Sequence, residues 1–488
     1  MELIQEKVSY FDTSARKTIN YDEITDAIVP DSLPDILRIV NTAGSVVVKE
    51  ETYQKDRVLI SGTVKAAVVY MPEAEDEAKL LEVPVNFTHM EETKNRDENT
   101  VSYARCKLLG IDVRAVNSRK ISVIASLQVE YNWAEPKELE ISSGIYDDTY
   151  LYEVLAEEKK LRLLSDIAVK PFGILEDVSD NFADGKIIGA SAVMKTVETK
   201  TVPGKLILKG EAKIKNTLLD SVGNFHFKEN MVPFTQILDI QSEHENDAVS
   251  ISYHIKGVEC EKKDEGTAAV CVNGDIVVKT YREQAVTCIQ DLYQTDYEID
   301  WESETVGIAC EYPAEHSTIV FSEEASAGMR MTDILEAHCV CESVGKNGAC
   351  VMIAKMLFTS DDGRTYSVTR KINHQFDVAE GMQLRNVTVD NAAAVPRGDS
   401  AELKITAVLD WVECGERLVL NIKSAVLNLE KPKAAFAPVG LILRYPKSGE
   451  SLWSIAKEYS TTMDAIKEAN AMDGAALKEN EMLLIPVR

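Results

Sequence analysis

The sequence lacks a long hydrophobic run. Its longest apolar stretches, such as Val64–Met71, are short, and this one contains Lys65. A helix that spans a bilayer needs about 18 or more apolar residues in a row. No basic region followed by an apolar core stands at the N-terminus, so no secretory signal is visible. We therefore expect a cytosolic protein that is not inserted in a membrane.

Positive charge is scarce as well. The 488 residues include 53 Lys and Arg against 80 Asp and Glu, which gives a net charge of −27. Proteins that bind the phosphates of nucleic acids, or the anionic surface of a membrane, need a positive face. The composition therefore disfavours nucleic acids and membrane surfaces as partners.

The common signatures of metal and catalytic sites are absent from the sequence. The nine cysteines form no CxxC pair, and their tightest cluster is His338-Cys339-Val340-Cys341, where a strand would turn His338 away from both cysteines. No GxxxxGK[ST], GxSxG or HExxH motif occurs. We expect reduced, mostly buried thiols, no metal, no cofactor, no catalytic residues and no enzymatic activity.

The sequence contains enough hydrophobic residues to form several cores. It also contains an internal repeat. Hydrophobic residues make up 45% of the chain, and a chain of this length typically forms about three domains. Segments 39–64, 187–212 and 333–355 align with one another. The glycine at position 62 recurs as Gly210, and Lys355 replaces it in the third segment.

Each copy alternates apolar and polar residues with a period of two, which is the pattern of strands with one buried face. Val83-Pro84-Val85-Asn86-Phe87 is echoed by Val232-Pro233-Phe234, and a second alternating strand follows in every copy. Two β-rich halves per copy favour a pair of packed sheets. The sequence therefore predicts a mainly β protein built from three tandem β-sandwich-like repeats.

The repeats are predicted at 1–140, 183–300 and 332–430, with connecting segments at 141–182 and 301–331. Within the first connecting segment, apolar residues at helical spacing predict a short helix; it would lie over Asp148–Ala168.

Residues 431–440 contain two prolines and several alanines, which is typical of a linker. We therefore expect residues 1–430 to fold without the segment that follows.

The hydrophobic period changes in residues 441–488. Leu452, Ile455, Ala456 and Tyr459 form one helical face, Ser451 and Thr462 are suited to cap two helices, and strand-like runs stand at both ends. The order is βααβ. The segment resembles the LysM family, whose pattern is matched by Gly449-Glu450-Ser451-Leu452-Trp453-Ser454-Ile455-Ala456-Lys457-Glu458-Tyr459, by Asn470 and by Leu483-Leu484-Ile485-Pro486.

This resemblance implies a shallow groove that binds N-acetylglucosamine polymers such as peptidoglycan or chitin. The groove residues would be Gly449, Glu450, Ser451, Leu452, Asn470, Ala471 and Met472. Trp453 lies off the inward stripe, so we expect it to be partly exposed and to contact a ligand, either sugar or protein. The alternative is that Leu452 belongs to the core, that Asn470 only closes a helix, and that the groove binds protein or nothing.

The repeats resemble the SPOCS domain in Pro34-Asp35-Ile36-Leu37-Arg38-Ile39, in the strand at 58–62 and in Val232-Pro233-Phe234. SPOCS repeats followed by a C-terminal LysM module are similar to the SipL family, spore-envelope morphogenetic proteins of clostridia. The resemblance implies a scaffold in the mother-cell cytoplasm, at the forespore surface, that helps to assemble the spore coat. The implied partner, bound through the LysM region, is stage IV sporulation protein A, the ATPase of the coat's basement layer.

The alternative function is that of a cell-wall protein that binds peptidoglycan through the LysM module. The missing secretory signal favours the scaffold. A single LysM copy also lacks the avidity that tandem copies give to weak sugar binding. We therefore expect protein, and in particular the coat ATPase, to be the principal ligand of the groove.

Overall fold

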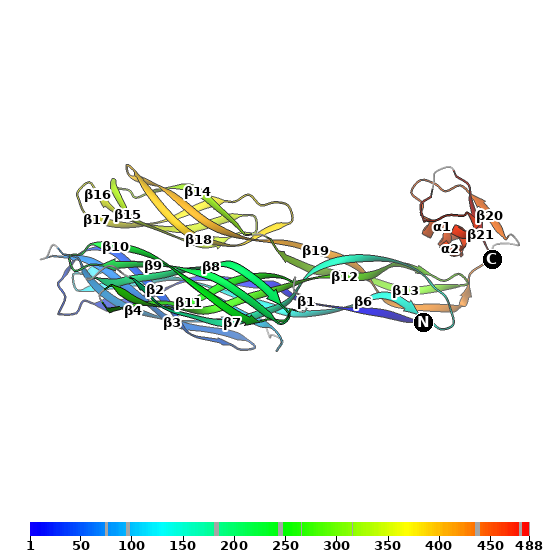
Figure 1. Cartoon of the computed structure of the whole chain (residues 1–488), viewed down its shortest axis with the longest axis horizontal. Helices are drawn as coiled ribbons and strands as arrows, with labels where there is room; N and C mark the ends of the chain where they lie inside the picture. Colours follow the sequence, from blue (N-terminus) through cyan, green and yellow to red (C-terminus); the bar gives the residue numbers. More distant parts are fainter. Residues whose placement is uncertain are drawn as a thin grey trace.

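The computed structural model describes residues 1–73, 77–93, 98–179, 185–242, 247–264, 266–314, 316–434, 440–477 and 481–487. Most of these residues lie in strands, and the helices found in the described ranges lie near the C-terminus. The prediction of a mainly β protein is confirmed. Figure 1 shows an elongated body of strands with a small domain at one end.

The body consists of three antiparallel sandwiches, which we call modules 1, 2 and 3. In module 1 the sheet β1-β6-β5 packs on the sheet β2-β3-β4. Its strands are β1 (Glu2–Ile28), β2 (Ile36–Tyr53), β3 (Arg57–Pro72), β4 (Lys79–Glu92), β5 (Val101–Asn117) and β6 (Lys120–Tyr146). The alternating apolar residues of β3 and β6 form the core between the two sheets.

Module 2 repeats this arrangement, with the sheet β11-β12-β7 packed on the sheet β10-β9-β8. Its strands are β7 (Glu153–Ser179), β8 (Lys186–Val202), β9 (Lys205–Leu219), β10 (Phe225–Asp239), β11 (Ala248–Asp264) and β12 (Thr267–Tyr293). The apolar face predicted for the second repeat points inward, because Leu206, Leu208, Ala212 and Ile214 are all buried in its core.

Module 3 differs at its start, where two shorter strands, β13 and β14, pair with two parts of the long β19. The sheet β15-β16-β17 packs on the sheet that contains β14, β18 and β19. The strands are β13 (Tyr297–Pro313), β14 (Ser317–Ser326), β15 (Met331–Val344), β16 (Ala349–Ser360), β17 (Thr365–Gln375), β18 (Met382–Arg397) and β19 (Ser400–Pro432).

The helix predicted over Asp148–Ala168 is wrong. Most of that segment belongs to β7, which pairs antiparallel with β12 along its whole length. Leu161 and Leu163 are buried two positions apart, so the same residues also fit a strand, and the long-range pairing overrides local spacing. The segments 141–182 and 301–331, predicted to connect the repeats, contain β7 and β13 with β14, and the limits of the repeats stay a prediction.

The C-terminal domain contains β20 (Leu441–Arg444), α1 (Leu452–Glu458), α2 (Met463–Ala469) and β21 (Leu483–Pro486). β20 and β21 pair antiparallel. This is the predicted βααβ order. Of the predicted linker 431–440, the first two residues still belong to β19, and residues 435–439 lie outside the described residues.

Modules 1 and 2 meet at a buried histidine of β11. His254 is 6% exposed, and its Nδ1–H donates to the carbonyl oxygen of Ala104 at 3.0 Å. Burial and the nearby Arg105 lower the pKa of His254 from 6.5 to about 4. The imidazole is therefore neutral in the folded protein at pH values where it would be protonated in the unfolded chain.

Acid is expected to weaken this junction. Between the folded pKa of about 4 and the ordinary value of 6.5, the unfolded chain binds the additional proton. Stability therefore falls as pH drops through that window, by on the order of 2 kcal/mol for this one group. We expect His254→Gln to lose less stability than the parent protein between pH 7.5 and pH 4.5, as measured by urea unfolding. An equal acid-induced loss in the two proteins would contradict the assignment.

Candidate functional site

The helices of the C-terminal domain begin where the sequence places their caps. The Oγ of Ser451 accepts the backbone N–H of Ser454 at 3.0 Å, and the Ser454 Oγ accepts the backbone N–H of Ser451 at 3.1 Å, which makes a capping box. Thr462 caps α2 by accepting the backbone N–H of Ala465 at 3.0 Å. The Ser451 cap fixes the loop at the start of α1, which is the first of the two loops of the predicted groove.

The first of the two groove loops is held by the Glu450 carboxylate. One oxygen accepts the backbone N–H of Lys447 at 2.8 Å, and the other pairs with the Arg444 guanidinium at 2.6 Å. The Lys447 N–H and the charge of Arg444 both lower the pKa of Glu450. The same turn contains Gly449, whose φ of +85° suits a glycine. The Glu450 side chain therefore stabilises its own loop.

The second groove loop follows α2. The Asn470 amide donates to the carbonyl oxygen of Ile466 at 2.7 Å and to that of Leu484 at 2.6 Å, and its Oδ1 accepts the Leu484 N–H at 2.8 Å. Asn470 thus closes the helix and ties it to β21. Ala471 is exposed with φ +49°, while Met472 packs against the core of the domain.

The sequence analysis expected Trp453 to be partly exposed, and that expectation is wrong. Only 7% of this residue is exposed, because its ring packs edge to face on Tyr293 with 4.9 Å between ring centroids. Its Nε1–H donates to the Asp291 carboxylate at 2.8 Å. Both partners lie near the C-terminal end of β12, in module 2. The tryptophan does leave the inward stripe of α1, as predicted, but it contacts the body of the same chain.

The C-terminal domain is therefore docked on module 2. The Lys457 ammonium pairs with both oxygens of Asp291, at 2.6 and 2.8 Å. The Tyr293 hydroxyl donates to the carbonyl oxygen of Thr461 at 2.8 Å, and Lys433 lies over the Tyr293 ring. We call this contact the docking interface. Sequence reasoning missed Asp291 and Tyr293, since nothing in the local pattern of β12 indicates a partner so far along the chain.

The predicted groove residues divide into three sets. Leu452 and Trp453 are buried, Glu450, Asn470 and Met472 are bonded or packed within the domain, and Gly449, Ser451 and Ala471 are exposed. Leu452 lies in the core of the domain, as the alternative interpretation held. Whether these residues bind a ligand stays a prediction.

A second surface of the C-terminal domain is apolar and open. Ile442, Leu483 and Ile485 point into the core, so the alternate residues of β20, β21 and their flanks point away from the helices. The exposed ones are Leu441, Leu443, Tyr445 and Met482. We call these four residues the apolar sheet face. In Figure 1, β20 lies on the outer side of the domain.

In the described ranges, no group of three or more His, Cys, Asp or Glu side chains is placed to hold a metal ion. None of the helices within those ranges is long and apolar enough to cross a membrane. The nine cysteines are free thiols, five of them buried and four half-buried.

Comparison with known proteins agrees with the resemblance in two parts of the chain. A search among curated proteins finds no match. Among protein families, residues 35–116, from just before β2 to near the end of β5, match the SPOCS domain of SipL, and residues 447–486 match the LysM domain. Both are non-catalytic binding domains. The chain thus combines a SipL SPOCS domain with a C-terminal LysM domain, an architecture that supports a sporulation-related LysM protein.

Proposed function

We propose that the protein is a non-enzymatic scaffold of the spore envelope. It acts in the mother-cell cytoplasm, at the forespore surface, where it helps to assemble the coat. Its LysM region binds stage IV sporulation protein A, the ATPase of the coat's basement layer. The observation that carries this proposal is the apolar sheet face. It lies on the LysM domain of a chain that also contains a SipL SPOCS domain.

The apolar sheet face is suited to a protein partner. Leu443 is 59% exposed and Tyr445 is 62% exposed, and they follow one another on the same side of the strand. Contiguous exposed apolar side chains mark protein interaction sites, and tyrosine is frequent among the residues that dominate binding. A partner that covered these side chains would remove them from water without disturbing the docking interface.

The groove offers a sugar fewer free groups than its residue types indicate. The carboxylate of Glu450 and the amide of Asn470 are engaged within the domain, and Trp453 is engaged by module 2. Sugar recognition depends on polar groups and aromatic faces that are free to meet the ligand. This supports protein over glycan as the principal ligand of the LysM region.

We expect Leu443→Glu to weaken capture of the coat ATPase more than tenfold. A carboxylate placed in an apolar contact must be desolvated without a partner, and burial of that kind costs more than about 2 kcal/mol. The measurement is a titration of the purified ATPase with the full-length chain. The control is Leu175→Glu, because Leu175 is 73% exposed on β7, outside the LysM domain, and its change should leave capture intact.

Two outcomes would contradict the proposal. If Leu443→Glu captured the ATPase as well as the parent protein, the apolar sheet face would not be the site of contact. Micromolar or tighter binding of chitin oligomers by the full-length chain, together with unchanged capture, would favour the peptidoglycan-binding alternative.

A further inference from the structure

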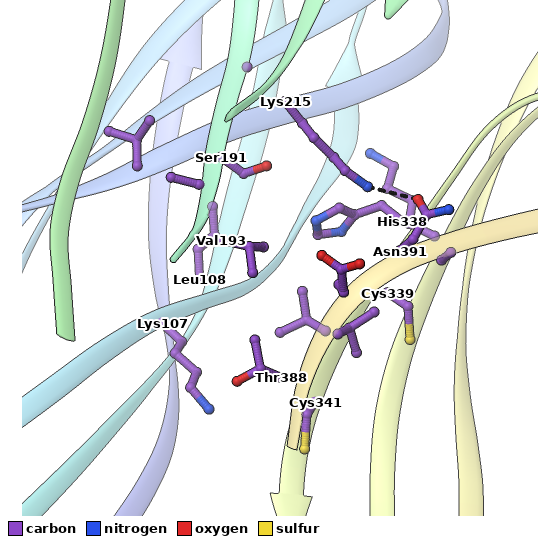
Figure 2. A pocket seen from close by; sticks show the side chains of 18 of the residues that line it. Lys107, Leu108, Ser191, Val193, Lys215, His338, Cys339, Cys341, Thr388 and Asn391 are labelled. Carbon is purple, nitrogen blue, oxygen red and sulfur yellow. Dashed lines mark hydrogen bonds between the residues drawn. The ribbon is translucent and has the colours of Figure 1, made fainter. Parts of the chain in front are cut away.

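The three modules border a half-open cavity that the proposed scaffold function does not use. Its volume is about 980 Å³, and it lies where β2 and β5 of module 1, β8, β9 and β11 of module 2, and β15 and β18 of module 3 meet. Figure 2 shows side chains of all three modules that line it. Cavities of roughly 300–1,000 Å³ are typical of sites for small organic molecules.

The charge of the cavity lining is opposite to that of the whole chain. The chain has 53 basic and 80 acidic residues. Among the residues that line the cavity, the basic ones outnumber the acidic ones: Arg105, Lys107, Lys195, Lys215, Lys228 and Lys355 against Glu229, Glu336, Asp390 and Asp410. A strongly acidic chain that gathers cations at one internal surface creates a local positive potential there.

The acidic side chains of the lining have partners of their own. Asp390 pairs with Lys213 at 2.9 Å, and Asp410 with His316 at 2.8 Å. Glu229 lies 3.7 Å from both Lys213 and Lys215, and Glu336 accepts a hydrogen bond from Thr217. Asp390 is thus paired with a lysine that does not line the cavity, and Asp410 is paired with a histidine. Glu336 also attracts Lys355, and Asp410 also attracts Arg105. None of the four is among the groups that most strongly attract Lys107.

Lys228 and Lys107 are cations of the lining that have no hydrogen-bond partner in the described ranges, and Lys107 lies beside other cations. Within the part of the chain that the structure describes, its ammonium forms no ion pair and no hydrogen bond with a side chain or carbonyl group. Its neighbours Arg105 and Arg16 are also cations. The carboxylate that attracts Lys107 is Glu130, which Arg16 already holds at 2.9 Å, while Arg105 is attracted by both Glu130 and Asp410. The Arg105 guanidinium donates a hydrogen bond to the neutral amide oxygen of Asn386, at 3.2 Å.

Burial disfavours the charged forms of these groups, and neighbouring cations add to that effect at Lys107 and His338. Burial and the charge of Arg105 lower the pKa of Lys107 to about 8. Burial also lowers the pKa of Lys355 to about 8. His338 projects toward the cavity, and burial together with Lys215 and Lys355 lowers its pKa to about 4. Each cationic form is disfavoured where it stands, and an anion in the cavity would reverse that effect.

The surface between the cations is apolar. In Figure 2, Val193 of β8 lies between Lys107 and Lys215. Val340 of β15, two residues after His338 and therefore on the same face of the strand, also lines the cavity. A ligand that fits this lining has a charged group beside the lysine and an apolar body against the two aliphatic side chains.

We propose that this cavity binds an organic anion, a small molecule with an apolar body and a carboxylate or phosphate group whose charge is held by Lys107 and Arg105. The ligand would touch all three modules, and it would therefore favour the arrangement in which they border it. This site is separate from the LysM domain, so its test does not depend on the proposed scaffold function.

The proposal is tested with 1-anilinonaphthalene-8-sulfonate, an apolar fluorophore with one negative charge, and the full-length chain. We expect saturable binding that octanoate or octyl phosphate displaces and the neutral 1-octanol does not. Lys107→Met should weaken binding of the fluorophore at least about tenfold, since it removes the charged partner of the sulfonate. The control is Lys200→Met, an exposed lysine of β8 that does not line the cavity, which should bind like the parent.

A second measurement separates loss of binding from loss of folding. Removal of an uncompensated interior charge should raise the melting temperature of the unliganded protein, so Lys107→Met should melt higher than the parent. Octanoate should raise the melting temperature of the parent and not that of Lys107→Met, while Lys107→Arg should keep the response. Equal displacement by octanol and octanoate, unaltered binding by Lys107→Met, or no saturable binding by the parent would each overturn the proposal.

Discussion

Asp291→Lys is expected to release the C-terminal domain from module 2. Asp291 accepts the indole N–H of Trp453 and pairs with the Lys457 ammonium. The substitution leaves the indole N–H without an acceptor while the ring is still buried, and it places two ammonium groups side by side. The unpaired buried indole N–H costs about 1–3 kcal/mol, and the repulsion at the half-exposed Lys457 adds about 1 kcal/mol, which together shift a docking equilibrium more than about tenfold.

Limited proteolysis followed by gel filtration measures this release. A cut in the linker 431–440 should leave the two fragments of the parent protein associated, because the docking interface joins them without the peptide bond. The same cut in Asp291→Lys should separate them. Glu283→Lys, on the same strand and paired with Arg162 at 3.6 Å, is the matched control and should stay associated.

A charge swap tests whether the effect belongs to the pair. Asp291→Lys combined with Lys457→Glu restores opposite charges across the interface, so the double variant should regain part of the association. If the fragments of the parent protein separate after the cut, the docking interface does not hold in solution. If the double variant is no better than the single one, the Lys457 contact contributes nothing.

The docking interface also changes what a Trp453 variant reports. Sequence reasoning placed Trp453 at the ligand surface, so that Trp453→Ala would weaken capture of the coat ATPase directly. Because the ring packs on Tyr293, the first effect of that change is on the position of the domain. A loss of capture in Trp453→Ala would therefore combine undocking with any lost contact, whereas Leu443→Glu tests the apolar sheet face alone.

Much of the architecture could be predicted because it follows from the local spacing of apolar residues along the chain. The alternation in β3, β9 and β16 predicted strands, and the change of period at Leu452 predicted the helical part of the C-terminal domain. What could not be predicted depends on contacts between distant segments. β7 was assigned in part to a helix because its pairing with β12, more than a hundred residues along the chain, is not visible in its own spacing. Trp453 was misplaced for the same reason.

In two of the repeats a glycine contacts a phenylalanine, and the sequence analysis recognised both residues as repeated without recognising that they are in contact. Gly62 and Gly210 were aligned as one position of the repeat, and the Val-Pro motifs that end in Phe87 and Phe234 were aligned as another. The structure makes each glycine the cross-strand partner of its phenylalanine, Gly62 with Phe87 and Gly210 with Phe234. The hairpin register sets this pairing, and sequence alone did not fix that register.

Because the phenylalanine ring covers the glycine, Gly210→Ala is expected to destabilise module 2 by about 3 kcal/mol. A Cβ at this position would lie 2.4 Å from the Phe234 Cζ and 2.7 Å from the carbonyl oxygen of Lys195. The partly buried Phe234 ring packs against the core of module 2 and must shift to make room, and the carbonyl belongs to the neighbouring strand β8. Hydrogen exchange of the β9 amides measures the change, since it reports the opening of this module rather than of the whole chain.

The matched control is Gly173→Ala, in β7 of the same module, where no atom lies within 4 Å of the added Cβ. This change should alter stability by less than about 0.5 kcal/mol. Removing the ring should relieve part of the clash, so Gly210→Ala combined with Phe234→Leu should cost less than the two single changes added together. Strict additivity would mean that the ring does not lie over Gly210. The glycine of the repeat would then need another explanation, one that also accounts for its replacement by Lys355 in module 3, where that side chain reaches across to Thr42 of module 1.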